Sequence, residues 1–147
     1  TSLLESVVKE GTGKRVKALN RPVAGKTGTT NDLQDAWFLG YTPRFISGVW
    51  VGYDNGQTLG KGETGSRTAS PIWLGFMDTI MKDQPVRMFQ VPEGVVFTKI
   101  DAETGLLPIP ESRKTLFECF KEGTVPTEYT NTPDTIVDAE SFFKSDM

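Results

Sequence analysis

The chain has 147 residues, a formal net charge of −3, 37% hydrophobic residues and 24% charged residues, which suits one globular domain with a real core. The acidic balance argues against a nucleic-acid partner, and no apolar run is long enough to span a membrane, so we expect no membrane contact by this segment. Histidine is absent and Cys119 is the only cysteine, which excludes His-based triads, the usual zinc sites and an internal disulfide. We expect no metal and no cofactor.

The N-terminal residues predict a short helix. Ser2 and Glu5 form a capping-box pattern, and Gly11 is a stop signal. One side of this helix is apolar, through Leu3, Leu4, Val7 and Val8. It is either a short helix or the last turns of a longer one, in a chain that we expect to start inside a longer protein. A polar, basic connection is expected from Thr12 to Asn20.

Three strands are predicted next, and their short connections favour antiparallel hairpins. They cover Pro22–Thr29, Asp35–Tyr41 and Phe45–Tyr53. The second and third strands carry apolar side chains on both alternating faces, so both faces of the sheet should be covered. Few helices are available in the chain for this purpose, and we therefore expect partner elements to come from elsewhere. The three tryptophans are expected in the core: Trp37, Trp50 and Trp73.

A Gly-rich loop is predicted from Asp54 to Arg67, followed by an amphipathic helix. Ser70 is a good N-cap, Pro71 suits the first helical position, and the helix should end before Gln84. Its apolar stripe is expected to pack on the sheet and consists of Trp73, Phe76, Met77, Ile80 and Met81.

The composition changes after residue 85, where prolines recur. Val95–Ile100 predicts one edge strand, Asp101–Gly105 a turn, and Cys119 is interpreted as a small buried apolar residue. The acidic residues from about 130 predict a mobile tail. We therefore predict two regions, 1–85 and 86–147.

Lys26, Thr27, Gly28 and Thr29 are the strongest candidates for a binding site. A lysine can fix a carboxylate, a threonine hydroxyl can donate to it, and a glycine lets an extended peptide pair along the strand edge. The Thr29 N–H could point at an acyl oxygen as half of an oxyanion hole. One tension remains, since strict alternation puts Lys26 and Thr27 on opposite faces of a strand. Serving one ligand requires a twisted edge or a ligand that lies along it.

A phosphate-binding loop is an alternative for Gly25-Lys26-Thr27. That motif needs a glycine at position 20, which is Asn20, and a helix directly after it, where Asn31-Asp32 predicts a turn.

The run from Arg21 to Met77 resembles the C-terminal part of the transpeptidase domain of class A, bifunctional penicillin-binding proteins. The matching stretches are Arg21–Asp32, Asp35–Pro43, Gly48–Asp54 and Ala69–Trp73. Further matches are Val7-Val8 with Gly11–Gly13, Ile100-Asp101, Thr104–Leu106 and Phe120–Pro126.

The resemblance implies an α+β fold with an antiparallel sheet covered by helices, of which this chain would lack the N-terminal strands and the helical lobe. It implies a serine acyl transfer on peptidoglycan stem peptides ending in D-Ala-D-Ala, which β-lactams mimic. Lys26, Thr27, Gly28 and Thr29 would bind the substrate or a β-lactam, and the rest of the transpeptidase domain would be a partner. The parent would lie outside the cytoplasm, anchored to the bacterial inner membrane by an N-terminal helix, and would also be a glycosyltransferase.

The sequence departs from the family in its catalytic motifs. Ser6-Val7-Val8-Lys9 and Ser141-Phe142-Phe143-Lys144 fit Ser-x-x-Lys literally, but the family's nucleophile lies far upstream of the Lys-Thr-Gly strand, and no Ser-x-Asn occurs. We therefore predict no catalytic residue in this chain, which should be inactive alone. A non-catalytic binding or scaffold module with the same fold, and a β-lactamase, are the alternatives.

Overall fold

The computed structural model describes residues 1–131 of the chain. It divides into two compact units, Thr1–Gln90 and Val91–Met147, each of which is described by itself. The Ser141–Lys144 motif and nearly all of the predicted tail lie outside the described residues.

Two helical segments open the first unit. Helix α1 covers Ser2–Lys9, as its apolar stripe predicts, and Val8 is its buried residue. The connection that follows differs from the sequence prediction, because Lys14–Leu19 forms a 3₁₀-helix, η1. Val16 and Leu19, three residues apart, are buried on one side of η1, which is the period of a 3₁₀-helix.

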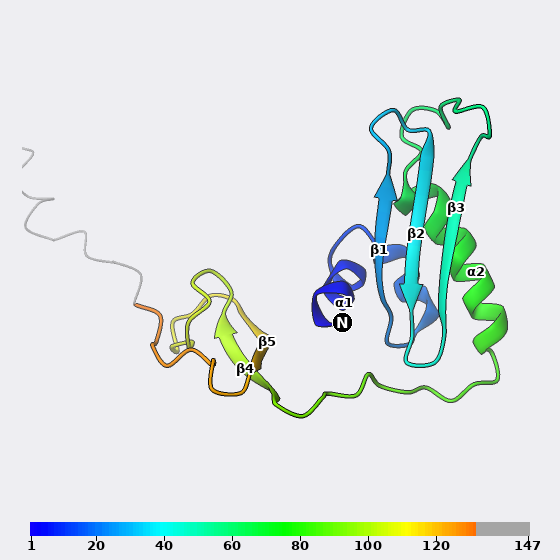
Figure 1. Cartoon of the computed structure of the whole chain (residues 1–147). Coiled ribbons are helices and arrows are strands. Elements are labelled where there is room, and N and C mark those ends of the chain that lie inside the picture. Colours follow the sequence, from blue (N-terminus) through cyan, green and yellow to red (C-terminus); the bar gives the residue numbers. More distant parts are fainter. Residues whose placement is uncertain (132–147) are drawn as a thin grey trace, which may run out of the picture. The chain divides into compact units, whose positions relative to one another are not determined.

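The centre of this unit is an antiparallel sheet with strand order β1-β2-β3 (Figure 1). Strand β1 is Ala24–Thr29, β2 is Asp35–Tyr41 and β3 is Ile46–Gly52. The register places Gly28 opposite Trp37 and Trp37 opposite Trp50. The α+β class and the three strands predicted from alternation are confirmed, with β1 at one edge of the sheet in this chain.

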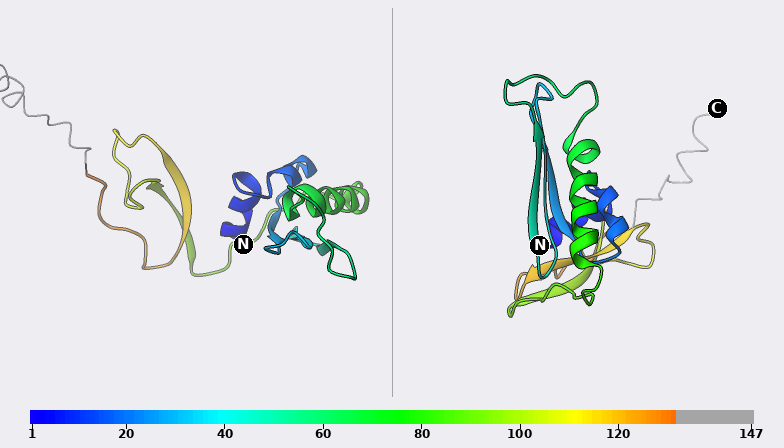
Figure 2. Two further views of the ribbon diagram at one scale, coloured as in Figure 1. Left: turned by 90° about the horizontal axis from the view of Figure 1, so that it is seen from above. Right: turned by 90° about the vertical axis from the view of Figure 1, so that its right-hand side faces the viewer.

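Helix α2, Ser70–Met81, covers one face of the sheet, which we call the inner face. The right panel of Figure 2 shows the sheet edge-on with α2 along that side. Trp73 from α2 lies edge-on to Phe38 from β2, with ring centroids 5.2 Å apart, and its indole N–H donates to the Ser47 carbonyl at 3.1 Å. Both rings are fully buried. The stripe of α2 therefore forms the core, although Phe76 is half exposed.

The start of α2 differs in detail from the prediction. A π-helical turn, η2, covers Gly65–Ala69 and runs directly into α2, so the loop predicted to reach Arg67 ends earlier. Ser70 is therefore inside a continuous helical segment, and its hydroxyl donates to the Ser66 carbonyl at 2.6 Å instead of capping. A π-helical turn shifts the chain by one residue and recurs at functional sites.

The opposite face of the sheet, the open face, is exposed within this unit. It carries large apolar side chains with the following exposed fractions: Trp37 43%, Leu39 51%, Trp50 44% and Ile46 74%. The prediction that Trp37 and Trp50 are core residues is therefore wrong for this chain, whereas Trp73 is buried. The alternation that predicted two apolar faces is correct, but α2 covers only one of them. An apolar surface of this kind is typical of an interaction site.

We expect the isolated chain to self-associate through the open face, because burying apolar area is favourable. The double change Leu39→Glu and Ile46→Lys should reduce association in sedimentation velocity. Leu3→Glu, at an exposed leucine of α1, is the matched control and should change nothing. A wild-type chain that stays monomeric and melts cooperatively would contradict this prediction.

The second unit contains a two-stranded antiparallel sheet of β4, Val95–Asp101, and β5, Thr115–Lys121. Only β4 was predicted, and the edge strand expected there gains β5 as its partner. Cys119 on β5 lies opposite Phe97 and is only half-buried, which corrects the interpretation of a buried thiol. Among the described residues, no helix is both long and apolar enough to cross a membrane.

Candidate functional site

The predicted binding residues lie on the edge of β1 that pairs with no other strand among residues 1–131, although α1 packs against β1. The Thr30 N–H donates to the Asp35 carbonyl at 3.1 Å, which fixes the hydrogen-bonding phase of the β1–β2 pair. Because hydrogen-bonded and non-hydrogen-bonded pairs alternate in an antiparallel ladder, Thr29 and Thr27 belong to non-hydrogen-bonded pairs. Their backbone N–H and C=O groups therefore point away from β2, toward the edge.

Lys26 and Thr27 lie on opposite faces of β1, as strict alternation requires. Lys26 is paired with Leu39 and shares the open face, while Thr27 is paired with Phe38 and shares the inner face. The lysine nevertheless reaches the edge, because its amine donates to the Thr27 carbonyl at 2.7 Å. Lys26 is exposed, and no ion pair involves it in the part of the chain that the structure describes. The cation therefore lies against the Thr27 backbone at the edge, while the Thr27 hydroxyl is on the inner face.

Thr27 is connected to two residues that the sequence did not single out as site residues. Its hydroxyl lies 2.7 Å from the Thr12 hydroxyl, in the loop after α1, and either oxygen can be the donor. The Ser66 hydroxyl on η2 donates in turn to the Thr12 carbonyl at 2.6 Å. These three residues, Ser66, Thr12 and Thr27, are called the relay below; they join three segments of the chain, with Ser66 bonded to the Thr12 backbone and Thr12 bonded to Thr27 through its hydroxyl. Ser66 and Thr12 are 54 positions apart.

The end of β1 is held by η2. The Gly65 N–H donates to the Thr29 hydroxyl at 3.1 Å. Gly65 itself lies directly on the strand backbone, since a Cβ atom there would be 2.2 Å from the Trp37 carbonyl oxygen and 2.5 Å from the Gly28 carbonyl oxygen. Only glycine fits this contact. The closeness of Gly65 to Gly28 was not predicted, because a Gly-rich loop does not indicate which of its glycines approaches another segment.

Ser6 and Lys9, the literal Ser-x-x-Lys pair of α1, do not interact with each other. The Ser6 hydroxyl donates to the Ser2 carbonyl at 3.3 Å, and the Lys9 amine lies 3.8 Å from the Glu5 carboxylate. Both contacts follow the α-helical spacing of four residues. A serine activated by a lysine needs the two groups within hydrogen-bond reach, which is not the arrangement in α1.

Two charged residues near the motif have structural partners. The Arg67 guanidinium lies 3.6 Å from the Glu63 carboxylate, four residues earlier. The Asp35 carboxylate accepts a hydrogen bond from the Trp50 indole N–H at 2.8 Å. Asp35 therefore anchors a tryptophan of the open face.

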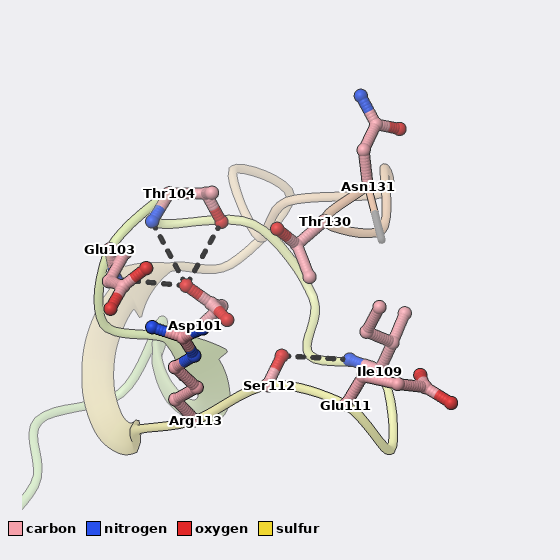
Figure 3. Close-up of a pocket in the computed structure, with 9 residues that line it drawn as sticks. All are labelled: Asp101, Glu103, Thr104, Ile109, Glu111, Ser112, Arg113, Thr130 and Asn131. Carbon is pink, nitrogen blue, oxygen red and sulfur yellow. Dashed lines mark hydrogen bonds between the residues drawn. The ribbon is translucent and has the colours of Figure 1, made fainter. Parts of the chain in front are cut away.

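The second unit has a hollow of ≈ 230 Å³ beside the turn that follows β4 (Figure 3). Asp101 at its base accepts bonds from the backbone N–H groups of Glu103 and Thr104, at 2.9 and 3.0 Å. The Ser112 hydroxyl, followed by these N–H groups, holds the pKa of the Asp101 carboxyl below its usual value of 3.8. The carboxylate is thus occupied in ordering the turn predicted there. No cluster suited to a metal ion occurs among residues 1–131.

Comparisons with known proteins give matches to the same kind of protein in both units of the chain. The family model described as "Penicillin-binding protein 1A, C-terminal domain" matches residues 91–135. Penicillin-binding protein 1A of Pseudomonas aeruginosa is 43% identical over 134 residues, which is 90% of this chain and 16% of that protein. Penicillin-binding protein 1A of Aquifex aeolicus is 43% identical over 124 residues, 84% of this chain and 17% of that protein.

A solved structure of a related protein also matches the fold of this chain. The crystal structure of penicillin-binding protein 1A from Haemophilus influenzae matches with a TM-score of 0.77 and 34% identity. The match covers 88% of this chain and 20% of that chain. The chain spans less than a fifth of the length of the curated relatives described above. By sequence and by fold, the chain belongs to the penicillin-binding protein 1A family.

Proposed function

We propose that this chain supplies the substrate-binding strand of a peptidoglycan D,D-transpeptidase that cross-links stem peptides by serine acyl transfer. In this proposal residues 1–85 are the C-terminal portion of the transpeptidase domain, and residues 86–147 are an extension that follows it. The nucleophile, its amine base and the Ser-x-Asn motif come from polypeptide outside residues 1–147. Membership of the family supports the reaction class, and the geometry of β1 supports the role of this segment.

The observation that carries the proposal is the convergence of three groups on the free edge of β1. The Lys26 amine is 2.7 Å from the Thr27 carbonyl, the same residue carries the Thr27 hydroxyl, and the Thr29 N–H points away from β2. An extended peptide ending in D-Ala-D-Ala can pair along this edge, because Gly28 has no side chain to obstruct it. Its terminal carboxylate then accepts from Thr27 and Lys26.

The Thr29 N–H has a different task. It donates to the acyl oxygen as negative charge develops there in the transition state, which is the contribution of an oxyanion-hole donor. Proton transfer and attack belong to the serine and the amine supplied by the other segments. A β-lactam follows the same path, because it presents a carboxylate and an acyl group in a comparable arrangement, and its ester stays on the serine.

We propose that the open face packs against the part of the same domain that lies outside this chain. Trp37, Leu39 and Trp50 form an apolar surface next to Lys26, and the helical lobe with its nucleophile is the proposed cover. We place the complete enzyme at the periplasmic face, anchored to the inner membrane by a segment outside this chain, and propose that it also carries a glycosyltransferase domain.

Incubation with a labelled penicillin tests this proposal. The complete protein should form a covalent adduct, and residues 1–147 alone should form none. Peptide mapping should place the adduct on a serine outside this chain. An adduct on Ser6 or Ser141 would refute the assignment, and a complete protein that forms no adduct would favour a scaffold module.

A further inference from the structure

We propose that Thr12 is a positioning residue that orients the Thr27 hydroxyl toward the ligand carboxylate. The proposal rests on the function proposed above for Thr27. It starts from the short contact between the two hydroxyl oxygens, 2.7 Å, in which either can donate. A carboxylate can only accept hydrogen bonds, so Thr27 must donate to it when the ligand binds. The Thr27 hydroxyl has one proton, and its contact with Thr12 is then satisfied only if Thr12 donates.

The relay therefore acquires a direction when the ligand is bound. Thr12 donates to Thr27, and Thr27 donates to the carboxylate. Hydrogen bonds arranged head to tail strengthen one another, so the Thr27 proton becomes a better donor. Ser66 supports this arrangement because its hydroxyl, 2.6 Å from the Thr12 carbonyl, fixes the Thr12 backbone against η2. Thr12 does not touch the ligand itself in this scheme.

A purely structural role explains the contact less well. Thr12 is exposed, and its hydroxyl bond to Thr27 lies at the surface. A surface bond between two hydroxyls adds little to folding, because water replaces either partner in the unfolded chain. The loop after α1 is already fixed by backbone bonds, including Gly13 N–H to the Val7 carbonyl at 2.9 Å.

The test uses the complete protein and two labelled ligands: a penicillin, and the same penicillin with its carboxylate blocked as a methyl ester. Thr12→Val should weaken pre-acylation binding of the free acid by about 3- to 10-fold, the effect of one net hydrogen bond. The acylation rate constant of the bound complex should hardly change, because the carboxylate contact exists before and during reaction. Binding of the ester should be unaffected, and Thr12→Ser should restore binding of the acid.

Two further variants separate the possible outcomes. Thr79→Val makes the same chemical change on an exposed turn of α2 and should behave as wild type. Thr27→Val should lose binding of the acid by about 10- to 100-fold, as expected for a bond to a charged group. If Thr27→Val has no effect, the proposed function fails, and this inference with it. If Thr27→Val is impaired and Thr12→Val is not, only the role of Thr12 is overturned. If Thr12→Val weakens binding of the acid and of the ester equally, or if Thr12→Ser does not restore binding of the acid, the positioning role of Thr12 is also overturned. Thr12 would then have only a structural role.

Discussion

Replacing Lys26 by alanine in the complete protein should lower the second-order rate constant of acylation by a labelled penicillin by about 10- to 100-fold, mainly through weaker binding of the carboxylate, as expected when a bond to a charged group is lost. The amine is exposed and its bond in this structure is to the carbonyl of the next residue, so the fold does not depend on it. Its loss removes the positive charge that fixes the carboxylate at the strand edge.

We expect the lower acylation rate to come from the lost contact with the ligand carboxylate, and three measurements distinguish this from misfolding. The melting temperature of Lys26→Ala should stay at the wild-type value. Lys26→Arg keeps the charge but not the compact amine, and it should recover part of the rate. Lys82→Ala, at the exposed end of α2, is the matched control and should acylate normally. A Lys26→Ala protein that acylates at the wild-type rate would remove β1 from the proposed site.

The strands could be predicted from the sequence because their signals are local. Alternating side chains from Asp35 to Tyr41 define one strand, and short turns on either side leave antiparallel neighbours as the economical arrangement. The same local pattern put Lys26 and Thr27 on opposite faces, which the register confirms. What the pattern could not give is the route by which the amine returns to the edge, because that depends on rotamers of a long side chain.

Elements set by packing between distant segments were missed. The turn predicted at Asp101–Gly105 does not lead directly into β5, because a long connection separates Asp101 from its pairing partner Thr115. The π-helical turn at Gly65 packs against Gly28 and Trp37, and the spacing of residues in the sequence does not predict that contact. The same holds for the relay of Ser66 and Thr12, in which the partners meet only because η2 packs against β1. Motifs locate the groups that face a ligand, while the residues that hold those groups appear only in three dimensions.

Gly65→Ala should be the most damaging small change behind the site. The added Cβ would lie 2.2 Å from the Trp37 carbonyl oxygen and 2.5 Å from that of Gly28, and both are backbone atoms of paired strands that cannot swing aside. Gly65 does not have a positive φ, so alanine is permitted by its backbone conformation and the effect is purely steric. Overpacking of this kind costs about 1–3 kcal/mol, and more where the neighbours are rigid.

The chain relieves the overlap by moving η2 away from β1, and this movement reaches the site. The hydrogen bond from the Gly65 N–H to the Thr29 hydroxyl should then break, and so should the bond from the Ser66 hydroxyl to the Thr12 carbonyl. Gly65→Ala in the complete protein should therefore lower both the melting temperature and the acylation rate. Gly75→Ala is the matched control, because a Cβ there meets nothing within 4 Å, and it should stabilise α2 by about 0.5–1 kcal/mol. If Gly65→Ala melts and acylates as wild type does, η2 does not support β1, and the edge keeps its geometry without it.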